Sequence, residues 1–232
     1  MLILQNRANF WFIIFPCFLF IGCSNETEPL NNQGHVTEAD NTEQNTFRIL
    51  ILGDSLTEGY GIAPHLAYPA LLEKELNKQI PSDYPPYKVI NGGVTGSTTS
   101  GGASRIGWYM KSPPDYLIVA LGGNDGLRGI PPEESKQNLR KIILEAQNYG
   151  VPVSLAGMKL PPNYGPSYLM RFEDIFEQLA EELKIPLIPF LLEGVGGDPK
   201  MNLPDRIHPN PDGHQRICQT VHQHLINHLI RN

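Results

Sequence analysis

The chain has 232 residues, of which 41% are hydrophobic and 18% are charged, which suits one α/β domain with additional segments. Its formal net charge of −6 argues against a nucleic acid as the main partner. Five carboxylates and no Lys or Arg fall in residues 24–46, so the remainder of the chain is nearly neutral. We therefore expect no strong surface field that would select a highly charged substrate.

Residues 1–22 have the pattern of a targeting segment. Arg7 supplies a single positive charge, and residues 10–21 are almost wholly apolar. This apolar stretch is shorter than the roughly 20 residues that span a membrane comfortably, and its length suits the core of a signal peptide. We therefore predict that residues 1–22 are a signal peptide rather than part of the fold.

The predicted signal peptide is followed by Cys23, and Gly22-Cys23 resembles the lipobox of bacterial lipoproteins, with Phe20 where Leu is usual. The resemblance implies cleavage before Cys23 and a lipid anchor on that residue, on the periplasmic side of the bacterial cell envelope. Ser24 stands in place of the Asp that retains lipoproteins at the inner membrane, which favours the outer membrane. An uncleaved anchor, or an ordinary signal peptide with a chance Cys, is the alternative.

Residues 23–46 are predicted to be the lipidated Cys followed by a disordered acidic tether. The segment has few large apolar residues, so it cannot bury enough surface to offset its chain entropy. Of the three cysteines only Cys218 remains after Cys17 is removed and Cys23 is acylated, which excludes an intramolecular disulfide. A single globular domain is predicted over residues 47–232, with Cys218 as a small core residue.

Strand-like and helix-like stretches alternate through this domain. Short apolar runs predict strands, and apolar residues at helical spacing predict helices. The expected strands cover residues 47–52, 87–90, 115–121, 151–156 and 187–190. The expected helices cover residues 68–80, 103–110, 132–148, 168–183 and 211–230. Five strands that are each followed by a helical segment predict an α/β fold with an open parallel sheet and right-handed crossovers.

Ser55 follows the first strand, within the stretch Gly53–Gly59, which reads GDSLTEG. A tight strand-to-helix turn can present a hydroxyl at the carboxyl edge of a parallel sheet, where open α/β folds place their sites. Asp54 is expected to order this turn rather than to do chemistry. The alternative for Ser55 itself is a serine that caps a helix N-terminus.

Asp205 and His208 lie three residues apart, just before the last predicted helix. Acyl transfer needs a hydroxyl activated by an imidazole, and the imidazole needs an acceptor for its other nitrogen. The other six histidines are predicted to be surface or core residues; His214 is the nearest rival and is expected to face away. No His/Cys cluster has metal-ligand spacing, so we expect neither a metal nor another cofactor.

Two Gly-rich loops follow the second and third strands, at residues 92–102 and 122–126. A tetrahedral intermediate needs hydrogen-bond donors for its developing oxyanion. The Asn124 amide and the backbone N–H groups of Gly96 and Ser55 are the candidates for this oxyanion hole. Ordinary turn chemistry is the alternative for both loops.

Together these stretches resemble the SGNH (GDSL-type) hydrolase family. Within it, Leu121–Gly129, Leu160–Gly165 and Asp205–Pro209 are similar to the bacterial group of arylesterases and multifunctional thioesterase I/lysophospholipase L1 enzymes. The resemblance implies a three-layer doubly wound sandwich with a mainly parallel five-stranded sheet in the flavodoxin-like order 2-1-3-4-5. Ser97, where the family usually has Asp, and Ala120, where Glu is frequent, depart from its pattern.

The resemblance further implies a carboxylic ester hydrolase with a catalytic triad of Ser55, His208 and Asp205 and an oxyanion hole of Ser55, Gly96 and Asn124. We expect a monomeric serine esterase that acts on lysophospholipids, aryl esters or acyl thioesters and is held at a membrane through Cys23. The alternatives are a carbohydrate O-acetylesterase of the same fold and, from another class, a non-catalytic envelope lipoprotein.

Overall fold

The computed structural model describes residues 46–230, with the exception of residues 79 and 82. The predicted signal peptide, Cys23 and the tether up to residue 45 lie outside the described residues. Within the described residues, no helix has both the length and the apolar character that crossing a bilayer would require.

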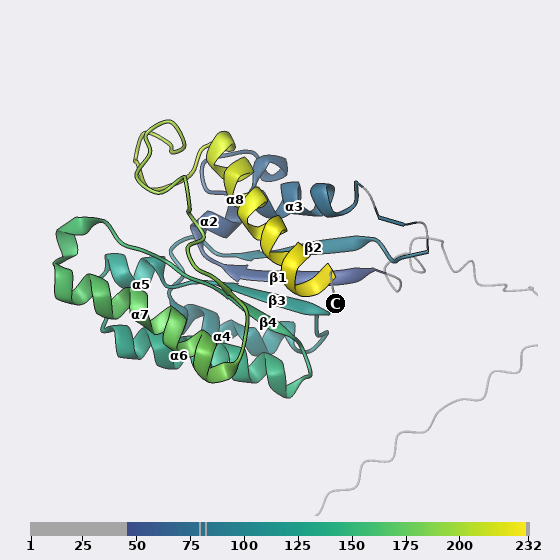
Figure 1. The fold of residues 1–232 in the computed structure, drawn as a ribbon, viewed down its shortest axis with the longest axis horizontal. Coiled ribbons are helices and arrows are strands. Elements are labelled where there is room, and N and C mark those ends of the chain that lie inside the picture. The colour runs from purple at the N-terminus through teal and green to yellow at the C-terminus, as the bar shows by residue number, and fades with distance from the viewer. Residues whose placement is uncertain (1–45, 79, 82, 231–232) are drawn as a thin grey trace, which may run out of the picture. The chain divides into compact units, whose positions relative to one another are not determined.

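A five-stranded parallel sheet forms the centre of the domain (Figure 1). Its strands are β1 (Phe47–Gly53), β2 (Tyr87–Gly93), β3 (Tyr116–Ala120), β4 (Val153–Ala156) and β5 (Leu187–Ile188). They lie in the order β2-β1-β3-β4-β5, and every neighbouring pair is parallel. This arrangement confirms the expected fold class and strand order.

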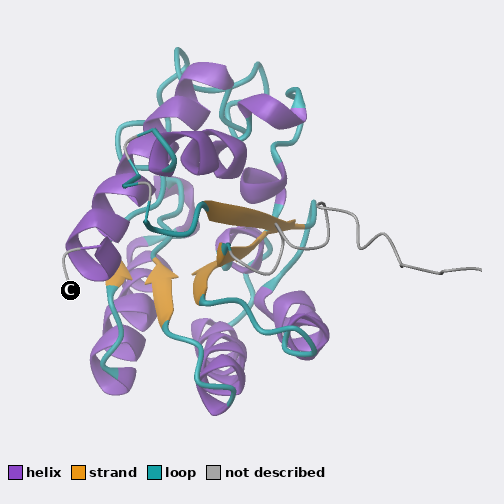
Figure 2. Ribbon diagram, turned by 90° about the vertical axis from the view of Figure 1, so that its right-hand side faces the viewer, coloured by secondary structure: helices purple, strands orange, loops and turns teal. Residues whose placement is uncertain are grey.

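Helices cover both faces of the sheet (Figures 1 and 2). The helices α3 (Tyr68–Leu76) and α8 (Pro211–Leu225) pack together on one face, and α8 continues as the π-helical turn η3 (Ile226–Ile230). The other face is covered by α4 (Thr99–Tyr109), α6 (Pro132–Asn148) and α7 (Pro166–Leu183). Shorter segments are the helices α2 (Ser55–Glu58) and α5 (Gly123–Leu127) and the 3-10 turns η1 (Pro64–Leu66) and η2 (Pro162–Tyr164).

The inner strands are apolar because helices cover both of their faces. All five residues of β3 are buried, and Ile49 to Leu52 of β1 are fully buried. A strand with two covered faces reads as a continuous apolar run rather than as an alternating one. The register aligns Gly53 of β1 with Gly93 of β2 and Ala120 of β3, so the segments that follow these strands start at one edge of the sheet.

Helix α4 begins earlier than predicted, at Thr99 rather than at residue 103. The prediction was wrong because two glycines in the first turn are poor helix formers. In the structure Thr98 caps the helix by accepting a hydrogen bond from the N–H of Gly101, at 3.3 Å. A Cβ at Gly102 would lie 2.3 Å from Leu121 Cδ1, so this glycine lets the helix approach the end of β3.

Other bounds also differ from the predictions. Helix α3 ends at Leu76 rather than at residue 80. Directly after Leu76, the side chain of Asn77 donates to the carbonyl of Glu73 at 2.8 Å. β2 runs three residues longer than predicted, to Gly93, and β5 is two residues shorter, ending at Ile188. Helix α6 has the predicted bounds.

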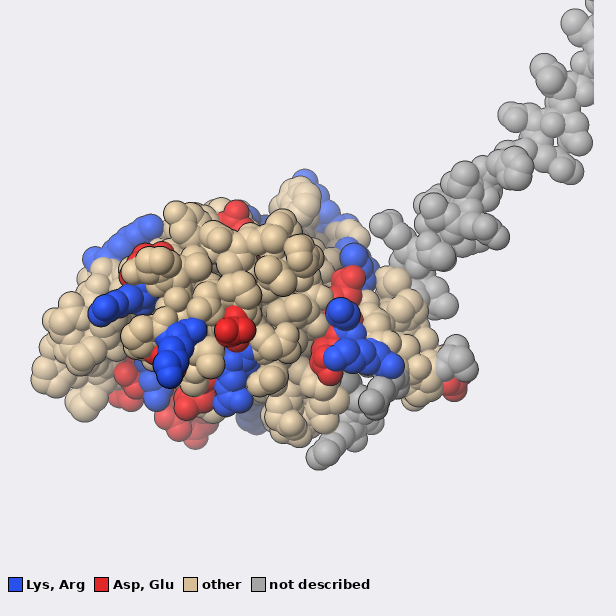
Figure 3. Space-filling view, turned by 90° about the horizontal axis from the view of Figure 1, so that it is seen from above, with Lys and Arg blue, Asp and Glu red and all other residues tan. Residues whose placement is uncertain are grey.

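Charged side chains of both signs are interspersed with uncharged residues on the face seen in Figure 3. No patch of a single sign dominates this face. The distribution agrees with the nearly neutral charge balance of the chain after residue 46.

Candidate active site

Ser55 is the first residue of the one-turn helix α2, directly beyond the end of β1. The side chain of Asp54 caps this helix by accepting from the N–H of Leu56 at 3.0 Å. A Cβ at Gly53 would lie 1.9 Å from Thr57 Oγ1, so only glycine allows the chain to turn this sharply. The sequence GDSLTEG therefore produces the predicted strand-to-helix turn and presents Ser55 at the carboxyl edge of the sheet.

His208 lies between Ser55 and Asp205. Its Nε2 is 3.0 Å from Ser55 Oγ, and its Nδ1 is 2.7 Å from Asp205 Oδ2. Both distances are hydrogen-bond distances, and both ring nitrogens are engaged. The structure thus brings together the three residues that the sequence nominated from opposite ends of the domain.

Asp205 is held as an anion by its own turn. Its Oδ1 accepts from the backbone N–H groups of His208, at 3.0 Å, and of Ile207, at 2.9 Å. These bonds, together with the bond to the His208 ring, lower the pKa of Asp205 to about 2. The carboxylate is therefore ionised at neutral pH and able to accept the Nδ1 proton of the imidazole.

The preceding loop, residues 193–204, supports this turn. The N–H of Leu203 donates to the carbonyl of His208 at 2.7 Å. Asn202 forms a β-bridge with Pro209, and its side chain donates to the carbonyls of Val195 and Asp198, each at 2.7 Å. The bond from Leu203 and the bridge between Asn202 and Pro209 thus hold the turn that contains Asp205 and His208.

Asn124 joins the nucleophile turn to the loop that contains Gly96. Its amide nitrogen donates to Asp54 Oδ2 at 3.2 Å and to the carbonyl of Ser97 at 3.1 Å. Gly96 has a positive φ of 74°, which favours glycine. Ser55, Gly96 and Asn124 therefore form a cluster at the sheet edge that is held by the bonds from Asn124 to Asp54 and Ser97, the neighbours of the other two residues, and the expected oxyanion role of the cluster remains a prediction.

Asp54 is almost fully buried below Ser55. Burial raises the pKa of Asp54 to about 6, against the opposing effect of its hydrogen bonds from Leu56 and Asn124. The expectation that Asp54 orders the turn agrees with these contacts. Its carboxylate holds α2 on one side and the Asn124 amide on the other.

Three residues that contact this cluster were not predicted from the sequence. Asp125 is buried and accepts from Thr99 and Ser135, which connects α5 with α4 and α6. Arg105 donates to Gly53 and Ser97, and the ring of Tyr60 lies against His208. For Asp125 the sequence offered only its position directly after Asn124; its burial, which is costly for a carboxylate without partners, is visible only in the structure.

His214 is not part of this arrangement. It lies in the first turn of α8, where its Nδ1 accepts from the N–H of Tyr68 at 3.2 Å. Burial lowers the pKa of His214 to about 4, so the ring is neutral at pH 7. In the structure the Nδ1 of His214 is thus bonded to Tyr68 and not to Ser55.

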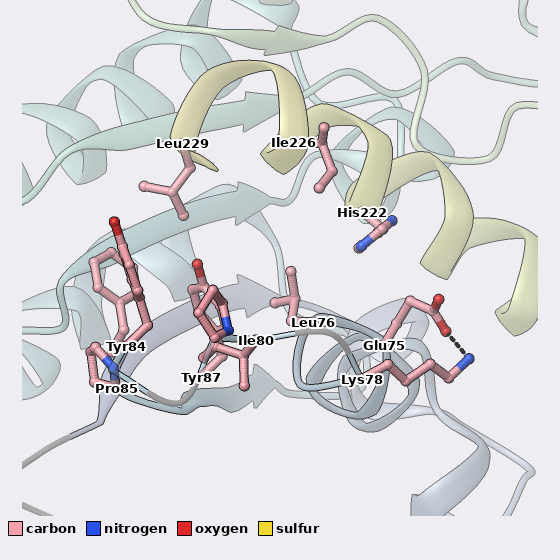
Figure 4. Close-up of a pocket in the computed structure, with 12 residues that line it drawn as sticks. Glu75, Leu76, Lys78, Ile80, Tyr84, Pro85, Tyr87, His222, Ile226 and Leu229 are labelled. Atoms are coloured by element: carbon pink, nitrogen blue, oxygen red, sulfur yellow. Dashed lines mark hydrogen bonds and ion pairs between the residues drawn. The ribbon is translucent and has the colours of Figure 1, made fainter. Parts of the chain in front are cut away.

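The described residues contain no group of three or more His, Cys, Asp or Glu side chains arranged to hold a metal ion. A cavity of about 690 Å³ lies elsewhere, between the ends of α3 and α8 and the beginnings of β1 and β2 (Figure 4). It is lined mainly by apolar and aromatic side chains, among them Phe47, Tyr87 and Leu229, and it contains none of the predicted site residues.

The sequence model of the GDSL-like lipase/acylhydrolase family matches residues 51–216, a span that contains Ser55, Gly96, Asn124, Asp205 and His208. The chain belongs to the GDSL-like lipase/acylhydrolase family. This finding confirms the resemblance drawn from the motifs, and with it the class of carboxylic ester hydrolases.

Curated relatives of this GDSL-like chain carry esterase names. An arylesterase of Vibrio mimicus is 37% identical over 187 residues, which are 80% of this chain and 92% of the relative. The thioesterase 1/protease 1/lysophospholipase L1 of Escherichia coli K12 is 36% identical over 184 residues, 78% of this chain and 85% of that protein. The crystal structure of TesA has a TM-score of 0.72 at 37% identity and covers 77% of this chain and 97% of that one.

Proposed function

We propose that this GDSL-like hydrolase is a serine esterase that hydrolyses acyl esters through Ser55, His208 and Asp205. The observation that carries the proposal is the continuous contact from Ser55 Oγ through the His208 ring to Asp205, at 3.0 and 2.7 Å. A hydroxyl, an imidazole and an ionised carboxylate in this sequence form the arrangement that activates a serine for attack on a carbonyl.

The order of these three groups determines the proton transfers of the acylation step. His208 Nε2 takes the Ser55 Oγ proton as Oγ forms a bond to the acyl carbon, and Asp205 stabilises the imidazolium through its bond to Nδ1. When the tetrahedral intermediate collapses, the bond from carbon to the alcohol or thiol breaks, and His208 returns the proton to this leaving group. Water then repeats the same steps on the acyl-serine and releases the acid.

The oxyanion receives hydrogen bonds from the backbone N–H groups of Ser55 and Gly96 and from the Asn124 amide. An amide nitrogen has two N–H donors, and those of Asn124 are directed at Asp54 and at the Ser97 carbonyl. Asn124 therefore takes part by exchanging one of these bonds for the oxyanion. Loss of one such donor typically costs about 10²–10³ in rate.

The substrates that we propose are lysophospholipids and aryl esters, with acyl thioesters accepted in vitro. The names arylesterase and lysophospholipase L1 of the relatives support this choice. It also rests on the proposal that Cys23 is lipidated at the outer membrane, since acyl-CoA is cytoplasmic and the lysophospholipids of the envelope are not. Residue 23 lies outside the described part of the chain.

The catalytic proposal is tested with a panel of lysophospholipids and aryl esters of graded acyl length, measured for the wild-type chain and for Ser55→Ala. We expect Ser55→Ala to lower kcat by about 10⁴-fold or more on every substrate that the wild type cleaves. Ester turnover that is unchanged in Ser55→Ala contradicts the catalytic proposal, whereas a wild-type chain that cleaves no ester of the panel favours a non-catalytic lipoprotein. Cleavage of acetyl esters alone contradicts the lysophospholipase assignment and favours a carbohydrate O-acetylesterase.

The anchor is tested separately by metabolic labelling with palmitate in a bacterial host. We expect label on the wild-type chain and none on Cys23→Ala, while Cys218→Ala, a matched control whose residue is buried in the domain, keeps the label. Label that persists in Cys23→Ala contradicts the anchor and leaves the esterase proposal unaffected.

A further inference from the structure

Tyr60 lies directly against the imidazole of His208. The centroids of the two rings are 4.5 Å apart, and their planes are inclined by 40°. This separation is at the short end of the range for interacting ring pairs in proteins. Tyr60 is 48% exposed, whereas the side chain of His208 is 19% exposed, so the tyrosine covers part of the histidine from solvent.

The backbone fixes Tyr60 relative to Ser55. The N–H groups of Gly59 and Tyr60 both donate to the carbonyl oxygen of Ser55, each at 3.1 Å. Gly59 ends α2 in a left-handed conformation with a φ of 88°, and a Cβ there would lie 2.6 Å from that of Ala67. The single helical turn that presents Ser55 therefore also determines where Tyr60 begins.

The loop that carries His208 has few bonds to the rest of the domain. Among the described residues, the hydrogen bonds of residues 203–208 stay within this loop, apart from the one between His208 and Ser55. Packing against the turn after α2 supplies further contacts. Tyr60 covers the His208 ring, and a Cβ at Gly61 would lie 2.7 Å from Leu203 Cδ1, so the two segments touch closely.

We propose that Tyr60 is a positioning residue for His208: its ring keeps Nε2 directed at Ser55 Oγ and stabilises the imidazolium that forms as Ser55 attacks the carbonyl. The inference rests on the proposed role of Ser55 and His208. The face of an aromatic ring carries partial negative charge and attracts a cation placed over it. The contact therefore strengthens when His208 becomes charged, and a contact that strengthens in the transition state raises kcat rather than lowering KM.

The test compares Tyr60→Leu, which removes the ring, with Tyr60→Phe, which removes only the hydroxyl. Tyr149→Leu is the matched control, because Tyr149 is also exposed, at 54%, and caps α6 next to the beginning of β4. Each variant is measured for kcat and KM with 4-nitrophenyl butyrate and for its thermal unfolding midpoint. We expect kcat of Tyr60→Leu to fall about 5- to 20-fold, within the range of about 2- to 30-fold that aromatic and cation–π contacts imply, with KM within about 2-fold of the wild type.

Tyr60→Phe is expected to restore at least half of the wild-type kcat, and Tyr149→Leu to leave kcat and KM unchanged. A Tyr60→Leu variant that keeps the full kcat overturns the proposal. An equal loss in Tyr60→Phe assigns the effect to the hydroxyl, and a change confined to KM assigns Tyr60 to substrate binding; either result also overturns it. The thermal unfolding midpoint shows whether each variant is fully folded at the assay temperature. A loss of kcat in a folded variant cannot come from unfolding.

The Ser55→Ala variant separates this proposal from the one on which it rests. If Ser55→Ala keeps wild-type turnover, the serine esterase proposal fails, and the role of Tyr60 fails with it. If Ser55→Ala is inactive while Tyr60→Leu is fully active, only the role of Tyr60 fails.

Discussion

Arg105 donates a 2.6 Å hydrogen bond from Nη2 to the carbonyl oxygen of Gly53, the last residue of β1. Its Nη1 donates to Ser97 Oγ at 2.5 Å. One guanidinium therefore connects the strand that leads to Ser55 with the loop that contains Gly96. The pKa of Arg105 is lowered by burial, which is the cost of placing a cation under this edge of the sheet.

Replacing Arg105 with Gln should destabilise the domain because it removes the charged donor of Ser97 Oγ and of the Gly53 carbonyl, which keeps only the 3.3 Å bond from the N–H of Val94. We expect the free energy of unfolding to fall by about 1–3 kcal/mol, the usual cost of a lost hydrogen bond to a charged group in a partly buried site. Urea unfolding followed by circular dichroism measures the change. Arg140→Gln serves as control: Arg140 pairs with Glu182 on the surface, and its loss should cost less than about 1 kcal/mol. Equal losses in both variants would contradict a structural role for Arg105.

Ser97 and Arg105 should be energetically coupled. Ser97→Ala removes the acceptor of Nη1 and leaves the bond to Gly53, so it should cost less stability than Arg105→Gln. In a double-mutant cycle by urea unfolding we expect a coupling of roughly 0.5–3 kcal/mol, as for residues in direct contact. Additive effects of the two substitutions would mean that the contact contributes nothing. The cycle also tests whether Ser97, at a position where the family usually has Asp, holds the Gly96 loop.

Asp54 should make the domain less stable as the pH rises from about 4 to about 6. Its pKa is raised by burial from 3.8 to about 6, so the folded state binds a proton that the unfolded state has already lost in this window. The unfolding free energy therefore falls with rising pH, by about 3 kcal/mol for a shift of this size. Asp54→Asn cannot titrate and should lose this component.

The measurement for Asp54 is the difference in unfolding free energy between Asp54→Asn and the wild type, at pH 4.5 and at pH 7.5. The difference removes the opposing contribution of His214 and His224, whose pKa values are both lowered to about 4 by burial and whose stabilisation is lost as the pH falls below 6.5. Asp54→Asn should gain stability relative to the wild type at the higher pH. A difference that does not depend on pH would show that Asp54 titrates normally.

Cys218 should be inert in the folded domain. It is 1% exposed, and burial raises the pKa of its thiol to about 11, so very little thiolate exists at pH 8. In a chain that carries Cys17→Ser and Cys23→Ser, Cys218 is the one remaining thiol. Reaction with Ellman's reagent at pH 8 should then be slow in buffer and complete within minutes in 8 M urea. Rapid reaction without urea would place the thiol at the surface.

The strands and long helices could be predicted because their causes are local or periodic. β3 is apolar throughout since both of its faces are covered, and α6 combines Pro near its start with two acidic residues in its first turn. The first turn of α4 could not be predicted, because its glycines serve packing against Leu121 and not helix formation. Neither could α2, since a helix of four residues has too few positions to show a period.

The residues that meet beyond the end of β1 could be nominated from the sequence, whereas the residues packed against them could not. Ser55, Asp205 and His208 have functional groups that acyl transfer requires, and they stand where strands end or a helix begins. Tyr60 and Arg105 act through side-chain contacts with segments far along the chain, and tyrosine or arginine at a surface is common for many reasons. Only the packing of the α2 turn and of α4 identifies their partners.

The cavity in Figure 4 also shows that the first and last described residues lie on the same side of the domain. Phe47, where β1 starts, and Leu229, near the end of the described chain, line it together. Ser55 lies beyond the other end of β1, roughly 20 Å away along a strand of seven residues. Both ends of the described part of the chain thus lie on the side opposite to Ser55. A domain coupled to a bead, a fusion partner or a surface directly at either of these two positions would have Ser55 on the side away from the attachment.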